Sequence, residues 1–243
     1  MNLVIDVGNT RVKVALFEGA KLCYDTVFLK RRIISELKKI KKEFNVDNAI
    51  ISSVASLSKS SLDKIKNLFP LVQLDYKTKI PFSNEYKTPK TLGVDRIALI
   101  AAVVKDYPKK NVLVIDAGTC ITYDFVNKKG VYSGGAIAPG IEMRYKALHV
   151  FTANLPLLRA EYPDSIIGNS TKNSIHSGVV NGVLSEIDGI IERYKQQNKN
   201  LTIVLTGGDT NFLSKRLKNG IFANPIFLLE GLNIILNYNL KND

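Results

Sequence analysis

Two short segments of the chain carry residue types that can hold a phosphate group and a cation together. Residues 3–10 read Leu-Val-Ile-Asp-Val-Gly-Asn-Thr, and residues 113–119 read Leu-Val-Ile-Asp-Ala-Gly-Thr. In both, apolar β-formers end at an aspartate, and a glycine then allows a tight turn that leaves backbone N–H groups open to ligand oxygens. The carboxylates of Asp6 and Asp116 can hold a cation against the same ligand. We therefore predict a duplicated unit with phosphate-binding turns at Gly8 and Gly118.

A third polar motif follows a long loop. Residues 76–92 contain two prolines and show neither a helical nor a strand period, as is typical of a loop. After Gly93, residues 97–104 are apolar on every side, which predicts a buried helix with Asp95 and Arg96 in its first turn. The helix dipole favours a carboxylate there, and Arg96 can bind a carboxylate or pair with Asp95. Taken alone, Asp95 fits equally well as an ordinary acidic residue at a helix start.

A fourth motif, Thr206-Gly207-Gly208-Asp209, reads as a glycine-rich turn from a strand into a helix. Such a turn can receive an adenosine or a phosphate, but it can equally be a tight connection, and a Gly-Gly pair alone is a weak signal. Upstream, residues 169–174 offer hydroxyl and amide donors before a long helix predicted over residues 174–196.

The elements that must position these motifs follow the same order twice. Two β-runs flank the turn after Asp6, a third lies near residues 22–29, and a strand (48–54), a helix (61–68) and a strand (71–74) follow a basic helix. From Asn111 the three-strand pattern repeats, and an apolar run over residues 226–236 is predicted to close the second half. This predicts an α/β protein of two ribonuclease-H-like halves, residues 1–110 and 111–243, with a nucleotide cleft between them as in the actin-like ATPases.

Composition is that of a globular protein, with 243 residues, 45% hydrophobic and 23% charged. No run of about 18 uninterrupted apolar residues occurs, and Met1 leads directly into a β-run, so we expect a soluble, cytoplasmic protein without a membrane segment. The two cysteines, Cys23 and Cys120, lack Cys-x-x-Cys or Cys/His partners, which argues against a disulfide framework or a zinc site. His149 and His176 have no ligand-spaced partner either and are interpreted as structural or surface residues.

The formal charge of +12 could indicate an anionic partner. Much of this excess lies between residues 30 and 42, where lysines and arginines interleave with Ile33, Ile34, Leu37 and Ile40 as on an amphipathic surface helix. Interleaved aromatics and a recognition-helix pattern are missing, so we expect no nucleic-acid partner. The remaining basic charge has no functional interpretation at this level.

The motifs together resemble the type III pantothenate kinases, a family of the acetate kinase, sugar kinase, heat-shock protein and actin superfamily. Each motif by itself is generic to that superfamily, whereas Gly-x-Asp-Arg together with the others is much more particular. The likeness runs in order from Val4 to about Leu232. It rests on Asp6-Val7-Gly8-Asn9-Thr10, Gly93-Val94-Asp95-Arg96, Asp116-Ala117-Gly118-Thr119, Gly135-Ala136-Ile137-Ala138-Pro139-Gly140, the segment 171–178 and Thr206-Gly207-Gly208.

The resemblance implies that the γ-phosphoryl group of ATP passes to the primary hydroxyl of pantothenate, the first step of coenzyme A synthesis. It implies Asp95 as the proton acceptor, Asp6 near magnesium, and Asp116 at a monovalent cation, potassium or ammonium. The pantothenate contacts it implies are Tyr86, Gly93, Val94, Asp95, Arg96 and Thr171. The ATP contacts it implies are Asp6, Val7, Gly8, Asn9, Thr10, Arg11, Val12, Lys13, Thr119, Gly207 and Gly208.

Family members are homodimers with the substrate site at the subunit interface, so the resemblance also implies a homodimer. Within the chain, Cys120 aligns with Thr10 of the first copy, which removes a hydroxyl from the second turn. Lys13 alternates along a strand on which it can instead point to solvent. Two alternatives stay open: another small-molecule kinase of the superfamily, and a noncatalytic regulator, because the family includes proteins described as transcriptional activators.

Overall fold

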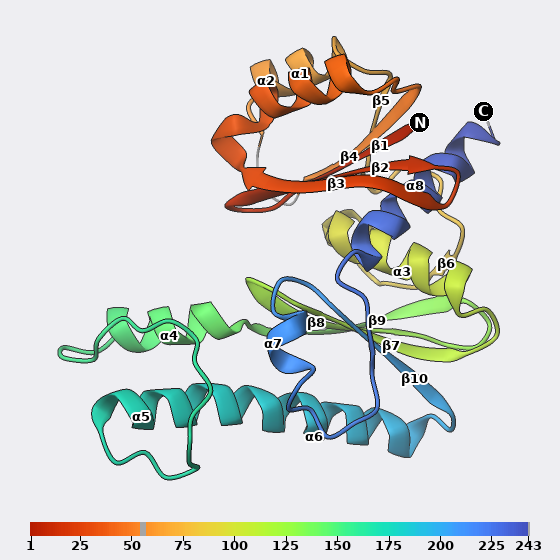
Figure 1. The fold of residues 1–243 in the computed structure, drawn as a ribbon. Coiled ribbons are helices and arrows are strands. Elements are labelled where there is room, and N and C mark those ends of the chain that lie inside the picture. Colours follow the sequence, from red (N-terminus) through yellow and green to blue (C-terminus); the bar gives the residue numbers. More distant parts are fainter. Residues whose placement is uncertain (54–56, 243) are drawn as a thin grey trace. The chain divides into compact units, whose positions relative to one another are not determined.

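The computed structural model describes residues 1–53 and 57–242 and shows a mixed α/β chain (Figure 1). By packing, the chain forms two compact units. Unit 1 contains Met1–Pro108, Gly130–Ser133 and Ile226–Asp243, and unit 2 contains Lys109–Lys129 and Gly134–Pro225. The predicted division between residues 110 and 111 describes the sequence duplication and stays a prediction.

Unit 1 contains a five-stranded sheet in the order β3-β2-β1-β4-β5. Its strands are β1 (Asn2–Val7), β2 (Arg11–Glu18), β3 (Lys21–Leu29), β4 (Asn48–Ser53) and β5 (Leu71–Gln73). The first three strands are antiparallel, whereas β4 pairs in parallel with β1 and β5 pairs in parallel with β4. All six residues of β1 are buried, as the continuous apolar run of a central strand requires. Val54, the last residue of the strand predicted over 48–54, lies outside the described residues.

The helices of unit 1 follow the predicted periodicities. Helix α1 buries Ile33, Leu37 and Ile40 and exposes its lysines, while α3 buries every residue from Arg96 to Val103. The elements are η1 (Lys30–Arg32), α1 (Ile33–Glu43), α2 (Lys59–Lys66), the short strand β6 (Ser83–Asn84), η2 (Pro89–Thr91), α3 (Val94–Asp106) and α8 (Phe227–Leu240). Strand β6 pairs in parallel with Val131 and Tyr132, which also belong to unit 1.

The last helix, α8, corrects the expectation that the final apolar run closes the second half. It packs mainly against α3 and also contacts β1, β2 and β4. A Cβ added at Gly231 would lie 1.9 Å from the carbonyl oxygen of Ala98, so glycine permits the close approach of α8 to α3. The Asn233 side chain bonds Asn2 Nδ2 at 2.9 Å and Gly19 O at 2.8 Å. These contacts join segments more than 200 residues apart, which is why periodicity alone misassigned the helix.

Unit 2 repeats the topology of unit 1. The second sheet is six-stranded, with the order β11-β10-β7-β8-β9-β6, and its first five strands have the same order as β5-β4-β1-β2-β3 of unit 1. Strand β7 is antiparallel to β8 and parallel to β10, and β10 is parallel to β11. The strands are β7 (Asn111–Ala117), β8 (Cys120–Val126), β9 (Val131–Pro139), β10 (Leu201–Thr206) and β11 (Phe222–Ala223). The shared order confirms the duplication predicted from the two aspartate turns.

The helices of unit 2 include the long helix predicted over residues 174–196. It is continuous but irregular, because a π-helical segment, η3 (Ser177–Asn181), lies between α5 (Thr171–His176) and α6 (Gly182–Gln197). The other helices are α4 (Ile141–Val150) and the short α7 (Thr210–Leu213). The inner stripe of Ile175, Val179, Val183, Ile187 and Ile191 packs into a core with β7, β8 and β10. Among the described residues, no helix has the length and apolarity needed to cross a membrane.

Candidate active site

The first aspartate turn joins β1 to β2 at the edge of unit 1. Asp6 is 9% exposed, and Ser52 Oγ donates a hydrogen bond of 2.8 Å to its Oδ1. Burial raises the pKa of Asp6, the Ser52 bond and the charge of Lys13 lower it, and the charge of Asp95 raises it. Lys13 is the cross-strand partner of Asp6 and is half-buried, so it acts on this carboxylate although it lies on a strand. Unit 1 thus holds two predicted site carboxylates close enough to interact.

The turn itself spans Gly8 to Arg11. Gly8 N–H donates to Arg11 O at 3.0 Å, and a Cβ at Gly8 would lie 3.2 Å from that oxygen. Asn9 and Thr10 are exposed at the tip, while Val7 and Val12 pair across the strands and are buried. The exposed backbone and polar side chains of this turn suit an anionic ligand, as the repeated glycine motif suggested.

Asp95 and Arg96 begin α3 as predicted. The carboxylate Oδ1 of Asp95 accepts a hydrogen bond of 2.8 Å from the Arg96 N–H, which fixes its orientation at the helix N-terminus. Gly93 is the N-cap, and a Cβ placed there would lie 2.4 Å from the same Oδ1. The backbone angles at Gly93, φ −58° and ψ 134°, suit any residue. A side chain at residue 93 would therefore act through the Asp95 carboxylate, which it would push out of its position.

Arg96 lies over two aromatic rings and is only 5% exposed. Its guanidinium carbon is 5.5 Å from the ring centre of Tyr86 and 6.0 Å from that of Tyr132. The two rings stack on each other, with centres 6.1 Å apart and planes 18° apart. The sequence predicted Tyr86 and Arg96 as site residues, but not Tyr132. Strand β6 pairs with Val131 and Tyr132, and this pairing brings Tyr132 to the site. The result is a fixed, buried cation beside the Asp95 helix start.

The second aspartate turn in unit 2 has a different length from the first. Ala117 pairs with Ile121, whereas Val7 pairs with Val12, so the second turn is one residue shorter. Gly118 N–H donates to Cys120 O at 2.9 Å, the equivalent of the Gly8–Arg11 bond. By strand register Cys120 therefore corresponds to Arg11, and the alignment of Cys120 with Thr10 was wrong.

Asp116 lies against the glycine-rich turn that follows β10. A Cβ at Gly207 would lie 2.3 Å from both Asp116 Oδ1 and Ala117 O, and Gly207 has a φ of +97°. The Gly207 backbone thus packs directly against a carboxylate and a carbonyl oxygen, and a side chain at this position would collide with both. The neighbouring residue, Gly208, has nothing within 4 Å of an added Cβ and is exposed. Tertiary structure therefore brings Asp116 and Gly207, far apart in sequence, to one place.

The same edge of unit 2 receives the start of α4. Gly140 N–H donates to Thr119 O at 3.1 Å, and a Cβ at Gly140 would lie 2.1 Å from Gly118 O. Thr119 itself is exposed. Burial, and next the charge of Glu142, raise the pKa of Asp209 to about 6. Sequence reasoning passed over Glu142 and Asp209 as a pair, because 66 intervening residues separate them.

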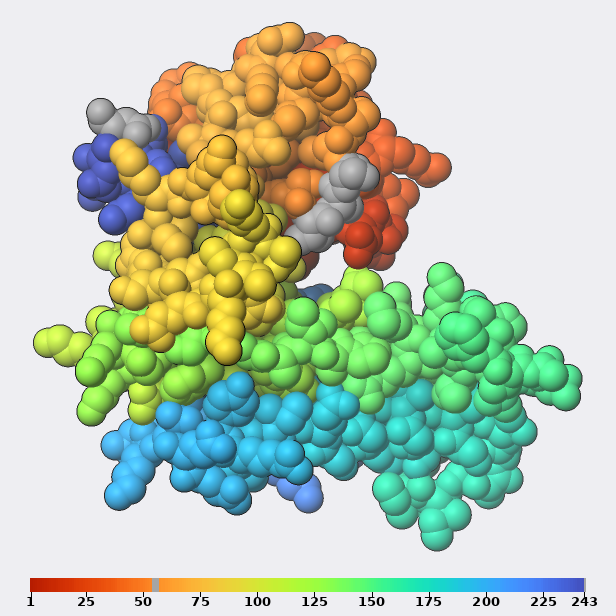
Figure 2. All heavy atoms as spheres, turned by 180° about the vertical axis from the view of Figure 1, so that it is seen from behind, coloured from red at the N-terminus to blue at the C-terminus, as the bar shows by residue number. Residues whose placement is uncertain are grey.

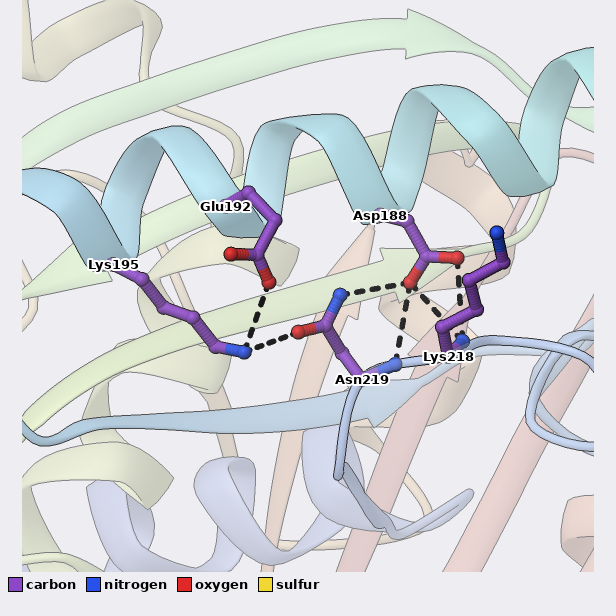
Figure 3. Close-up of polar contacts among 5 residues, drawn as sticks. All are labelled: Asp188, Glu192, Lys195, Lys218 and Asn219. Carbon is purple, nitrogen blue, oxygen red and sulfur yellow. Dashed lines mark hydrogen bonds and ion pairs between the residues drawn. The ribbon is translucent and has the colours of Figure 1, made fainter.

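A polar network ties the segment after α7 to α6 (Figure 3). Asp188 accepts hydrogen bonds from the backbone N–H of Lys218 at 3.2 Å and from Asn219 Nδ2 at 2.8 Å. Lys195 bonds Glu192 at 3.0 Å and also contacts Asn219 Oδ1. This network anchors the chain downstream of Gly207 and Gly208, and nothing in the sequence signalled it.

Thr171 is the first residue of α5. It is exposed and lines a groove of about 860 Å³ between α4 and the α5–η3 segment. Arg144, Phe151 and Val179 also line this groove. The segment between α4 and α5 projects from the rest of unit 2 in both views (Figures 1 and 2).

A family profile described as type III pantothenate kinase matches residues 2–193. A type III pantothenate kinase of Christiangramia forsetii is 52% identical over 240 residues, which cover 98% of this chain and 99% of that protein. A Campylobacter jejuni structure described as a Baf family transcriptional activator is similar with a TM-score of 0.66 at 22% identity, covering 98% of this chain and 99% of its own.

A ROK family glucokinase from Streptomyces griseus, in complex with glucose and AMPPNP, has a TM-score of 0.53 at 10% identity, with 98% of each chain covered. At this identity the likeness concerns the fold, and it confirms the predicted arrangement of two ribonuclease-H-like halves found in actin-like ATPases and sugar kinases. Profile and full-length identity identify the family directly: the chain belongs to the type III pantothenate kinases.

Proposed function

We infer that the chain catalyses the ATP-dependent phosphorylation of pantothenate to 4'-phosphopantothenate, the first step of coenzyme A biosynthesis. The observation that carries this inference beyond family membership is the start of α3. There Gly93 leaves room for the Asp95 carboxylate, the Arg96 N–H orients it, and the guanidinium of the adjacent Arg96 is held over two stacked tyrosine rings. A fixed carboxylate next to a fixed cation suits a substrate that carries both a hydroxyl and a carboxylate.

Asp95 is proposed as the catalytic residue. Its carboxylate accepts a hydrogen bond from the primary hydroxyl of pantothenate, orients the oxygen towards the γ-phosphoryl group and takes up the proton as the new P–O bond forms and the bond from the γ-phosphorus to ADP breaks. Because phosphoryl transfer passes through a loose transition state, positioning the hydroxyl contributes as much as removing its proton.

Pantothenate is proposed to contact Tyr86, Gly93, Val94, Arg96 and Thr171. Arg96 supplies a planar cation that can bind a carboxylate in two parallel hydrogen bonds. Its contact with the stacked rings of Tyr86 and Tyr132 restricts its rotamers, so less conformational entropy is lost on binding.

ATP is proposed to contact the turn from Asp6 to Lys13, with Thr119, Gly207 and Gly208 contributing in unit 2. The described residues include no cluster of three metal-ligating side chains. Proteins commonly bind magnesium through one or two carboxylates plus substrate phosphates. Asp6 is the proposed ligand, because a bound cation would stabilise its buried negative charge beside Asp95. Magnesium would neutralise charge on the phosphates.

A monovalent cation, potassium or ammonium, is proposed to bind at Asp116. Asp116 Oδ1 and Ala117 O lie close to one another against Gly207, and hard cations prefer such oxygen ligands. This support is geometric and comes from unit 2 alone.

The protein is proposed to act as a cytoplasmic homodimer without nucleic-acid or membrane partners. The groove beside Thr171 is lined by Leu148, Phe151 and Leu155, and Phe151 is 85% exposed. Exposed apolar surface of this kind is typical of protein interfaces. A Phe151→Glu variant should sediment as a monomer, and a dimer that persists at the same protein concentration would count against this interface.

The function is tested by measuring pantothenate-dependent ADP release by the wild type and Asp95→Asn, each with and without potassium. We expect turnover to fall by roughly 10²–10⁴-fold in Asp95→Asn while ATP still binds. Asp106→Asn is a matched control, since Asp106 ends the same helix and should leave turnover unchanged.

Two outcomes would favour the alternatives. ADP release with another alcohol but not with pantothenate would indicate a different small-molecule kinase. Tight, sequence-specific DNA binding without any kinase activity would indicate a regulator.

A further inference from the structure

Four lysines from three separate segments of unit 2 surround a concavity of about 690 Å³. Lys109 and Lys110 precede β7, Lys128 follows β8, and Lys199 lies between α6 and β10. The other described lining residues are asparagines, a glutamine and one threonine. None of the described lining residues is acidic or aromatic. This concavity, the four-lysine site, accounts for part of the basic charge that the proposed kinase site leaves without a role.

Asn111 joins two of these segments. Its Oδ1 accepts a hydrogen bond of 2.9 Å from the backbone N–H of Lys128, and its Nδ2 donates to Lys199 O at 3.3 Å. One side chain thus holds the turns that carry Lys128 and Lys199 in a fixed relation. A ligand that binds here therefore does not have to order the backbone of these two turns, which lowers the entropy cost of binding.

Lys109 has a left-handed backbone conformation, with a φ of 61°. This conformation costs a residue with a Cβ roughly 1–2 kcal/mol, and only glycine and, to a lesser degree, asparagine adopt it readily. Asn200 on another segment of the lining also has a positive φ, 56°, but there the residue type suits the conformation. Glycine or asparagine would be less strained at residue 109, so the strained lysine there indicates a role for its charge.

The four-lysine site lies at the far end of β7 from the proposed cation site. Asn111 begins this strand and Asp116 is its sixth residue, so at about 3.3 Å per residue the two lie roughly 17 Å apart. The site is therefore separate from the Asp116–Gly207 turn.

The lining indicates the chemistry of the ligand. The volume is that of a small-molecule site, and the absence of aromatic residues from the described lining offers no surface on which a nucleobase could stack. Its polar character equally disfavours a lipid chain. Lysines bind phosphates as point charges. The positive charge of four lysines exceeds the partial negative charge that the helix dipole places at the C-terminus of α6. We propose that the four-lysine site binds a chain of three or more phosphates, free or as part of a nucleotide.

The test is calorimetric titration of the full chain with inorganic tripolyphosphate at low ionic strength, in the presence of saturating magnesium and ADP to occupy the proposed kinase site. The variant Lys109→Asn/Lys128→Gln/Lys199→Gln is compared with Lys38→Gln/Lys42→Gln/Lys64→Gln, which removes the same charge from exposed positions of unit 1. Each exposed charge contact is worth about 2–5-fold, so we expect the first variant to bind at least about tenfold more weakly than the control. Pantothenate kinase turnover should be the same in the Lys109→Asn/Lys128→Gln/Lys199→Gln variant as in the wild type.

A second measurement uses Lys109→Asn alone. This variant should unfold at the same or a higher denaturant concentration than the wild type, because asparagine tolerates the left-handed conformation, and yet bind tripolyphosphate about 2–5-fold more weakly. A parallel titration with ATP shows whether the chain is recognised free or within a nucleotide.

Equal affinities of the two triple variants would overturn the proposal, as would a wild type that binds no tripolyphosphate once ADP is bound. Binding of a short single-stranded oligonucleotide without binding of tripolyphosphate would show that the assigned ligand class is wrong.

Discussion

Ser52 Oγ donates a hydrogen bond of 2.8 Å to Asp6 Oδ1 between the paired strands β4 and β1. Both residues are buried, Ser52 completely. Burial raises the pKa of Asp6, and the Ser52 bond is the largest influence that lowers it again. A serine outside the repeated motif therefore keeps the first turn's carboxylate available as an anion for a cation.

Ser52→Ala should shift the acidic limb of the pH–rate profile to higher pH. Without the hydroxyl, the pKa of Asp6 rises further, so a larger fraction of Asp6 is protonated at any given acidic pH. The loss of a hydrogen bond to a charged group should also lower the free energy of unfolding by roughly 2 kcal/mol. The profile is measured as kcat/KM for ATP from acidic to neutral pH. An unshifted acidic limb would show that Asp6 ionisation does not limit the reaction.

Gly93→Ala should reduce kcat without unfolding the protein. The new Cβ would lie 2.4 Å from Asp95 Oδ1, so the carboxylate must move, while the backbone angles at Gly93 accept alanine without strain. Displacing a catalytic group by about 1 Å can cost roughly 10²-fold in rate. Steady-state kinetics and thermal unfolding measure the two effects separately.

The control for this experiment is Gly189→Ala. Gly189 is an exposed residue of α6 with nothing within 4 Å of an added Cβ, so alanine should stabilise the helix by up to about 1 kcal/mol and leave kcat unchanged. A Gly93→Ala variant as active as this control would contradict the assigned role of Asp95.

Gly207→Ala and Gly208→Ala should differ strongly although the residues are neighbours. Alanine at residue 207 meets a φ of +97° and oxygens at 2.3 Å, so we expect it to lose at least about 2 kcal/mol of unfolding free energy. At residue 208 the added Cβ has open space, and the change should stay within about 0.5 kcal/mol. Urea unfolding of both variants measures the difference. If Gly208→Ala is stable but raises the KM for ATP, the proposed adenosine contact is supported.

Asp209 should make stability depend on pH. Its pKa is raised from 3.8 to about 6, so between these values the unfolded chain is ionised while the folded protein retains the proton. The unfolded state binds fewer protons there, and the free energy of unfolding therefore falls as the pH rises through about 6. Asp209→Asn should abolish this part of the fall. In Glu142→Gln the fall in unfolding free energy should end at a lower pH, because the charge of Glu142 contributes to the raised pKa of Asp209.

These unfolding measurements are compared between pH 4 and about 7 in denaturant. If the unfolding free energies of the wild type and of Asp209→Asn change with pH in the same way, this result would contradict the raised pKa of Asp209.

The two halves show where sequence patterns suffice. Each repeated aspartate turn lies between strands whose apolar runs predict them, and Asp95 lies one position inside a helix that its own apolar residues define. Such local features depend on neighbouring residues, which the sequence displays. The length of the second turn was misread, because the equivalence of Cys120 with Arg11 follows from strand register and not from adjacent letters.

By itself, the sequence determined the duplicated strand order, the aspartate turns and, through its resemblance, the family. Only the tertiary structure decided that α8 packs against α3 and that Ser52 bonds Asp6. It also placed Tyr132 against Tyr86 and Gly207 against Asp116. The physical reason is the same in each case: hydrogen bonds, ring stacking and close backbone approach depend on distances between segments that are remote in the chain. Residue order does not contain those distances until the sheets and helices have packed.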